Sequence, residues 1–119
     1  MGFLDWLGRK WAKKPDFTKV DSVLKAEALA AEGKLAPLHL VPLRFGGQDM
    51  PMNRVFVPAS VVERKKHHDE TIEGLVKDHK ADGYSCTPEY RDESVVPFRL
   101  DGMATEEGIP VYSWSIDVW

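Results

Sequence analysis

The spacing of apolar residues divides this chain into segments of helical and of extended periodicity. Apolar residues recur every three or four positions in residues 3–14 and again from residue 18 onward, which is typical of amphipathic helices. Pro15 separates these two segments. The second predicted helix covers residues 18–32 and has Asp16 or Thr18 as its N-cap. Its predicted apolar face consists of Val20, Leu24, Ala28, Ala31 and Leu35.

Two short apolar runs on either side of a polar loop predict a β-hairpin. The first run covers residues 38–43, and the second covers residues 55–57 and ends at Pro58. Pro42 has no backbone N–H to donate, so we expect the first strand to lie at a sheet edge or to be bulged there. The intervening residues 44–54 then form a long hairpin loop.

A third helix is predicted from residue 59 to residue 82, and it has an unusual centre. The residues between 63 and 70 include no apolar side chain. A helix with amphipathic ends and a polar centre either overhangs the sheet or borders a cleft. The simpler interpretation of this centre is a solvated charged face.

The last third of the chain has the period of two that is typical of strands. Apolar and polar residues alternate in residues 84–90, 96–101 and 111–118, so one face of each strand is expected to be buried. Residues 91–94 are short enough for a hairpin turn, and residues 102–109 are predicted to form a longer acidic loop. The three strands should form an antiparallel meander.

These elements predict an α+β fold. We expect an antiparallel sheet of about five strands, made of the hairpin and the three-stranded C-terminal meander, with the two main helices on one face. A length of 119 residues with 43% hydrophobic and 29% charged residues suits one globular domain. We assign this domain to residues 16–119, with a short basic amphipathic segment, residues 1–15, before it.

Charge is unevenly distributed along the chain, and this distribution bears on which classes of partner the protein can bind. Residues 1–14 carry a net charge of +3 and the remaining residues carry −6. The body has no evident basic face, so nucleic acid is not an expected partner. The basic segment could dock on a membrane surface or pack on its own domain. The single cysteine, Cys86, and the lack of a signal sequence or apolar span favour a cytoplasmic protein.

One cluster of potential metal ligands lies in the polar centre of the third helix. It consists of Glu63, His67, His68 and Asp69, and the first two are four residues apart on one helix face. A metal-assisted hydrolase would need the fold to bring in a further, distant acid. Since a charged, solvated face explains the same residues, we expect no metal and no other cofactor.

Cys86 is the other candidate for chemistry. A cysteine can act as a nucleophile when a histidine serves as its base. Its position on the inward register of a predicted strand favours instead a small buried side chain. No other catalytic motif is evident, and the chain is not expected to be an enzyme.

The hairpin loop is the best candidate for a binding surface. It offers polar side chains around two flexible thioethers, a composition that suits an adaptable protein interface. The candidate residues are Arg44, Gln48, Asp49, Met50, Met52 and Arg54.

The same loop carries a resemblance. Residues 43–53, Leu-Arg-Phe-Gly-Gly-Gln-Asp-Met-Pro-Met-Asn, are followed by Val57-Pro58 and later by Thr87-Pro88-Glu89-Tyr90. This pattern resembles a group of small uncharacterised bacterial proteins, some of them linked to toxin–immunity neighbourhoods, over residues 37–119. The resemblance implies a bacterial protein of immunity or accessory type that binds another protein. The alternatives are the small metal-assisted hydrolase and a peripheral membrane protein that uses residues 1–14.

Overall fold

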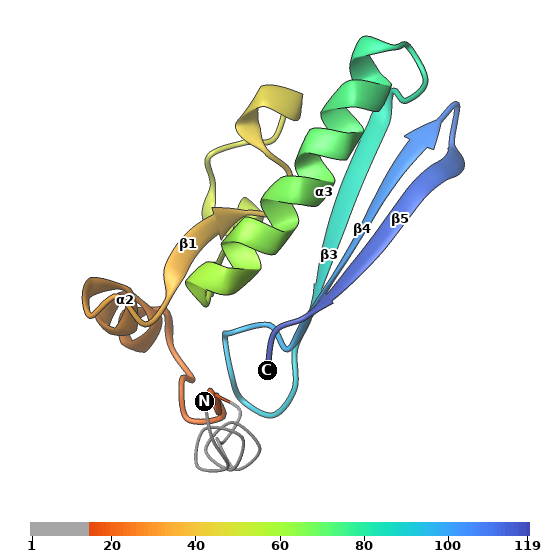
Figure 1. Cartoon of the computed structure of the whole chain (residues 1–119). Helices are drawn as coiled ribbons and strands as arrows, with labels where there is room; N and C mark the ends of the chain where they lie inside the picture. The colour runs from red at the N-terminus through yellow and green to blue at the C-terminus, as the bar shows by residue number, and fades with distance from the viewer. Residues whose placement is uncertain (1–14) are drawn as a thin grey trace, which may run out of the picture.

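A computed structural model describes residues 15–119 of the chain (Figure 1). In chain order the elements are α2 (Val23–Ala31), β1 (Ala36–His39), the 3-10 turns η1 (Leu43–Phe45) and η2 (Pro51–Asn53), β2 (Arg54–Val57), α3 (Ala59–Lys77), β3 (Gly83–Glu89), β4 (Arg99–Glu106) and β5 (Ile109–Asp117). The predicted α+β fold with antiparallel strands is therefore confirmed.

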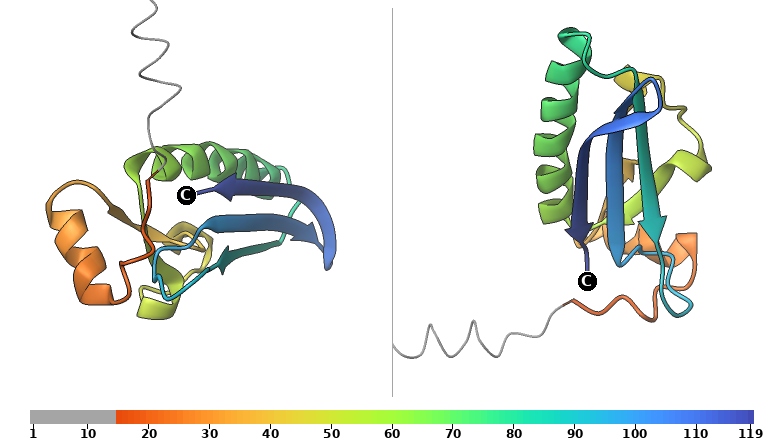
Figure 2. Two further views of the ribbon diagram at one scale, coloured as in Figure 1. Left: turned by 90° about the horizontal axis from the view of Figure 1, so that it is seen from below. Right: turned by 90° about the vertical axis from the view of Figure 1, so that its right-hand side faces the viewer.

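The five strands are divided between two sheets. β1 and β2 form an antiparallel hairpin, and β3, β4 and β5 form an antiparallel meander with β4 in the centre. Helix α3 lies along the three-stranded sheet, and the hairpin packs beside the same helix (Figures 1 and 2). Apolar residues from α2, α3 and both sheets form one buried cluster. Helix α3 is thus the element that joins the two sheets.

The first strand ends earlier than the apolar run predicts. β1 stops at His39, and residues 43–45 form the 3-10 turn η1. The carbonyl of Pro42 accepts hydrogen bonds from the backbone N–H groups of Phe45 and Gly47, which turns the chain away from the sheet. β1 lies at a sheet edge, as one of the two expectations had it, but Pro42 lies outside the strand, and the extension of that strand to residue 43 is wrong.

Helix α2 is shorter than predicted and buries a different face. Ser22 is its N-cap and accepts a hydrogen bond from the Lys25 backbone N–H, so Val20 lies before the helix. The Asp16 carboxylate accepts from the Thr18 backbone N–H in a turn and caps no helix. Ala26 is the buried helical residue, whereas the side chain of Leu24 is 78% exposed. Val20 and Leu35 of the predicted face are buried but lie outside the helix, so the predicted helical face is wrong.

The meander differs from prediction in the position of its central strand. β4 covers residues 99–106 and not 96–101, and the predicted acidic loop is largely strand. Glu107 and Gly108 both have positive φ angles, of 51° and 81°, and together make the tight turn into β5. The inward alternation predicted for the last strand is correct, since Trp114 and Ile116 are buried.

The polar centre of α3 contains the largest departure from the sequence-based interpretation. The buried residues of this helix are Val61, Lys65, Asp69 and Ile72, which recur at helical spacing on one face. Two charged residues therefore occupy core positions that apolar residues normally fill. The helix ends at Lys77, five residues before the predicted end. Within residues 15–119 the structure contains no helix with the length and apolar character to cross a membrane.

Candidate functional site

The side chain of Asn53 fixes the base of the hairpin loop, residues 44–54. The Asn53 side-chain amide donates to the backbone oxygens of Val41, at 2.8 Å, and Gln48, at 2.9 Å. Its side-chain oxygen accepts from the Val41 backbone N–H at 2.8 Å. Because one side chain makes three bonds to both arms of the loop, the loop is fixed across its base.

Two further residues attach the loop to α3 and to the meander. Arg44 Nε donates to Glu73 Oε2 of α3 at 2.8 Å. Hydrogen bonds from Lys77 and from Arg44 lower the pKa of Glu73. The ring of Phe45 stacks on Tyr84 of β3 with a centroid distance of 5.6 Å. The predicted binding residue Arg44 therefore has an internal partner.

Asp49 and Gly47 also stabilise the loop. Asp49 Oδ1 lies 3.0 Å from His39 Nε2, and the hydrogen bond from His39 lowers the pKa of Asp49. A Cβ atom on Gly47 would lie 2.0 Å from the backbone oxygen of Val41, so only glycine fits there. The residues that carry the loop pattern thus have local structural tasks.

After these contacts, the loop still presents apolar side chains to solvent. Met52 is 86% exposed and Met50 is 45% exposed. They border a hollow of about 370 Å³ whose lining is mainly apolar, formed by Val41, Gly46, Gly47, Gln48, Met50, Met52 and Asn53. Three of the six predicted binding residues, Gln48, Met50 and Met52, line this hollow. Arg54 lies apart from it, exposed at the start of β2.

The predicted metal ligands do not converge. Glu63 and His67 are exposed on α3, whereas Asp69 is buried on its inner face. His68 Nδ1 lies 2.7 Å from the hydroxyl of Tyr112, and its ring stacks on Trp114. Burial lowers the pKa of His68. Within residues 15–119, no group of three or more His, Cys, Asp or Glu side chains is placed to hold a metal ion.

What the sequence-based analysis missed is a buried polar cluster, which we define as Lys65, Asp69 and Tyr84. Lys65 is completely buried, and its Nζ donates to Asp69 Oδ2 at 2.9 Å. The Tyr84 hydroxyl donates to the other carboxylate oxygen. Burial and this bond to Asp69 raise the pKa of Tyr84, which therefore stays a donor. The signal was present in the sequence, since Lys65 and Asp69 continue the helical spacing of Val61 and Ile72.

Aromatic rings of the sheet enclose the ammonium group of this cluster. Lys65 Nζ lies 5.4 Å from the ring centroid of Tyr84 and 5.9 Å from that of Trp114. Gly102 leaves room for the indole, because a Cβ there would lie 1.9 Å from Trp114 Cε2. Ring faces attract a cation, so the sheet compensates part of its desolvation.

Cys86 lies on the same inner face of the sheet and is not poised for nucleophilic attack. Burial raises the pKa of its thiol to about 12. Since the thiolate is the nucleophile, this thiol is almost fully protonated near neutral pH. The interpretation of Cys86 as a small side chain of the sheet interior fits its environment, in which it packs against the core.

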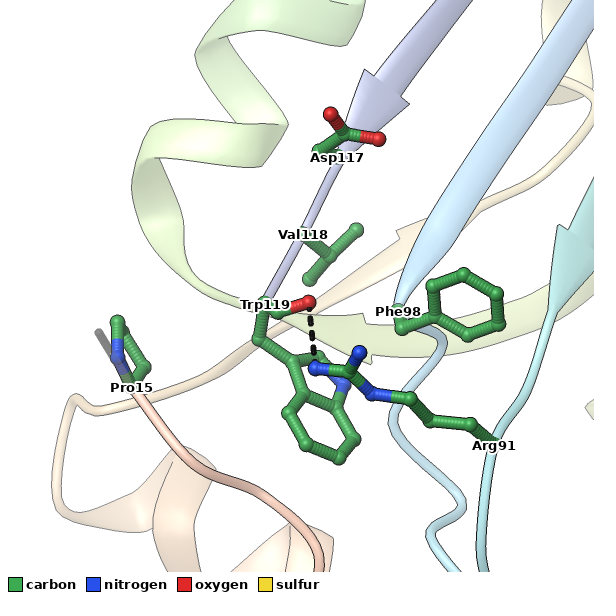
Figure 3. A pocket seen from close by; sticks show the side chains of 6 residues that line it. All are labelled: Pro15, Arg91, Phe98, Asp117, Val118 and Trp119. Atoms are coloured by element: carbon green, nitrogen blue, oxygen red, sulfur yellow. Dashed lines mark hydrogen bonds between the residues drawn. The ribbon is translucent and has the colours of Figure 1, made fainter.

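A different hollow, of about 420 Å³, lies at the end of the meander near Pro15 (Figure 3). The Arg91 guanidinium lies over the ring of Trp119, 4.2 Å from its centroid, and donates to the main-chain oxygen of that residue at 3.0 Å. Arg91 also lies 5.3 Å from the ring centroid of Phe98. Its charged group is thus engaged with neighbouring residues.

Comparison with known proteins adds no assignment. Nothing matches the chain among protein-family models, curated proteins or solved structures. The resemblance of the loop pattern therefore stays a prediction. The predicted amphipathic segment, residues 1–14, lies outside the described residues.

Proposed function

We propose that this chain binds another protein through the loop of residues 44–54, as an immunity or accessory type of protein. The observation that carries the proposal is the exposure of Met50 and Met52 on a loop that is fixed at its base. The partner that suits this surface inserts an apolar side chain into the hollow beside the two methionines.

Preorganisation supports this proposal. A loop that is already held in one conformation loses little entropy on binding, so more of the contact energy appears as affinity. Asn53 holds the base of the loop, and Phe45 and Arg44 attach it to β3 and α3. Methionine side chains are flexible and polarisable, which suits contact with an apolar partner group. The resemblance over residues 37–119 contributes the expectation of a protein partner, without identifying it.

The test is site-specific photo-crosslinking of the purified chain in an extract of the source cell. A photoreactive residue at position 52 should trap one protein, and the same group at position 111 on β5 should not. Excess purified wild-type chain should abolish the crosslink, whereas the Met50→Ser, Met52→Ser variant should fail to compete. A control variant, Ile109→Ser, Val111→Ser, removes apolar residues that are 66% and 43% exposed and should compete normally. Equal competition by both variants would overturn the proposal.

The two alternative functions rest on the sequence. No contact within residues 15–119 favours a metal-assisted hydrolase at Glu63, His67, His68 and Asp69. Membrane association through residues 1–14 is tested by liposome flotation of the intact chain against a chain that begins at Pro15. Equal behaviour of the two chains would exclude it.

A further inference from the structure

A second hollow lies between β1, the start of the hairpin loop and α3, and the proposed function does not use it. Its volume is about 360 Å³, at the small end of the range for ligand sites. Asp69, Arg44 and His39 line it together with apolar residues of β1 and η1. This hollow is where the buried polar cluster reaches the surface, because the Asp69 side chain is 8% exposed.

We propose that this hollow binds a small zwitterion, a free α-amino acid with an apolar side chain. The ammonium group of the ligand bonds to Asp69, its carboxylate bonds to Arg44, and its side chain packs on the apolar wall. Each of these three contacts follows from a separate feature of the hollow.

Asp69 provides the acceptor. Its carboxylate accepts one bond from Lys65 and one from Tyr84. An ionised carboxylate offers about four lone-pair sites, so further donors can be accommodated. Since the side chain is more than nine-tenths buried, an additional donor from a ligand would meet it with little competition from bulk water. Lys65 already compensates the charge of Asp69, so a ligand ammonium is favoured here because a charged donor makes a stronger hydrogen bond to a carboxylate than a neutral donor does.

Arg44 provides the donors for a carboxylate. Only its Nε is bonded to Glu73, and its two terminal nitrogens have no hydrogen-bond partner within residues 15–119. A guanidinium pairs with a carboxylate through two parallel hydrogen bonds, which suits these terminal groups. His39 lines the same hollow; its Nε2 faces Asp49, and its Nδ1 has no hydrogen-bond partner within residues 15–119.

One side of the hollow is apolar, and the other side is polar. Leu38, Pro42 and Leu43 form the apolar side, and none of them has a polar side-chain atom. A ligand side chain without polar groups can therefore pack here with no unpaired donor or acceptor. The hollow thus has a buried carboxylate, a guanidinium whose terminal nitrogens have no hydrogen-bond partner within residues 15–119, and an apolar side. An apolar amino acid matches these three features.

The test is calorimetric titration of the full chain with L-leucine and two analogues. N-acetylleucine lacks the ammonium group and also represents the last residue of a peptide. Leucinamide lacks the carboxylate and represents the first residue. We expect leucine to bind and each analogue to bind at least about tenfold more weakly, because each loses a charged hydrogen bond. Absence of heat with leucine, or equal binding of either analogue, would overturn the proposal.

Variants assign the contacts. In Arg44→Gln the affinities for leucine and leucinamide should become equal, because the carboxylate has lost its partner. Asp69 is best removed together with Lys65, as Lys65→Met, Asp69→Leu, since this change leaves no unpaired buried charge. There, leucine and N-acetylleucine should bind equally weakly. Val111→Ser, far from the hollow on β5, should bind leucine as the wild type does. Retention of full leucine affinity in both site variants would overturn the assignment.

Discussion

The hairpin loop and the centre of α3 distribute polar and apolar side chains in opposite ways. On the loop, two apolar methionines are exposed while Arg44, Asp49 and Asn53 form contacts that hold the chain in place. On α3, Lys65 and Asp69 lie in the core. The comparison teaches that polarity alone does not tell which residues of this chain face a partner. Which residues face a partner depends on whether their polar groups already have hydrogen-bond or ion-pair partners within the chain.

The two regions also differ in what their polar contacts contribute. Exposed ion pairs such as Arg44–Glu73 contribute little to stability individually. Removing one partner of the buried Lys65–Asp69 pair of α3 costs much more stability, because it leaves a buried charge without compensation. We therefore expect substitutions at α3 to change folding strongly, and substitutions at the loop surface to change binding while the fold is kept.

The largest effect is expected for Lys65→Ala. This change leaves Asp69 buried without its ammonium partner and opens a cavity between Tyr84 and Trp114. The free energy of unfolding should fall by about 3–5 kcal/mol, measured by urea denaturation.

The matched control for that variant is Lys65→Met, Asp69→Leu, Tyr84→Phe, which also removes the hydroxyl that would lose its acceptor on Asp69. It replaces both charges with apolar groups of similar size, a kind of change that is often neutral or stabilising. A stability close to the wild type would show that the cost of Lys65→Ala comes from the unpaired charge. A loss as large as that of the single variant would show instead that the pair itself is needed.

The alkylation rate of the Cys86 thiol measures how well the interior around the buried polar cluster is shielded from solvent. Burial raises its pKa from 9.0 to about 12, so at pH 8.5 its thiolate fraction should be about a thousandfold below that of an ordinary cysteine. Alkylation by iodoacetamide should be slow by a comparable factor relative to the urea-unfolded chain. Similar rates in the two states would contradict the closed interior.

The same shift predicts the direction of a pH effect. The folded protein keeps the Cys86 proton to a higher pH than the unfolded chain does. Its contribution to stability is present below pH 9 and is lost as the pH rises toward 12. The urea midpoint should therefore fall above pH 9, and less steeply in Cys86→Ala.

Periodicity predicted the fold class, because the ends of α3 and the whole of β5 are periodic. It failed at the ends of helices and strands, because local hydrogen bonds and backbone angles determine where these elements begin and end. Ser22 starts α2 and Pro42 turns the chain after β1. The positive φ angle of Glu107 moves the last hairpin turn. Each of these depends on a specific hydrogen bond or backbone angle that no periodic pattern contains.

The composition of the sequence pointed to the loop as a candidate site. It did not predict which contacts the loop residues make within the chain. Arg44 bonds to Glu73, which is 29 residues away along the chain, and Phe45 stacks on Tyr84. The Lys65–Asp69 pair was missed because charged residues are rarely buried, so a solvated face was the natural interpretation. Only the position of α3 against the sheet makes its inner face the buried one.

A smaller effect is expected for Asn53→Ala, which tests the rigidity of the loop. The change removes three hydrogen bonds to Val41 and Gln48 and leaves partly buried backbone groups unpaired. Stability should fall by about 1–3 kcal/mol. Hydrogen exchange should become faster at the Val41 amide, whose partner is lost. Unchanged protection at residue 41 would show that the loop is held by other contacts.

The smallest effect on folding is expected for Met52→Ser. This variant gives the clearest separation between residues that stabilise the fold and residues that bind a partner. Met52 is 86% exposed, so its replacement should change the free energy of unfolding by no more than about 0.5 kcal/mol. The measurement is the urea midpoint of the variant against the wild type. A clear loss of stability would mean that Met52 packs on its own chain, and the apolar surface proposed for a partner would then be an internal contact. An unchanged midpoint, together with lost competition in the crosslinking experiment, would assign the Met52 side chain to binding alone. An exposed thioether that does not stabilise the fold can contribute only through its contacts outside the chain.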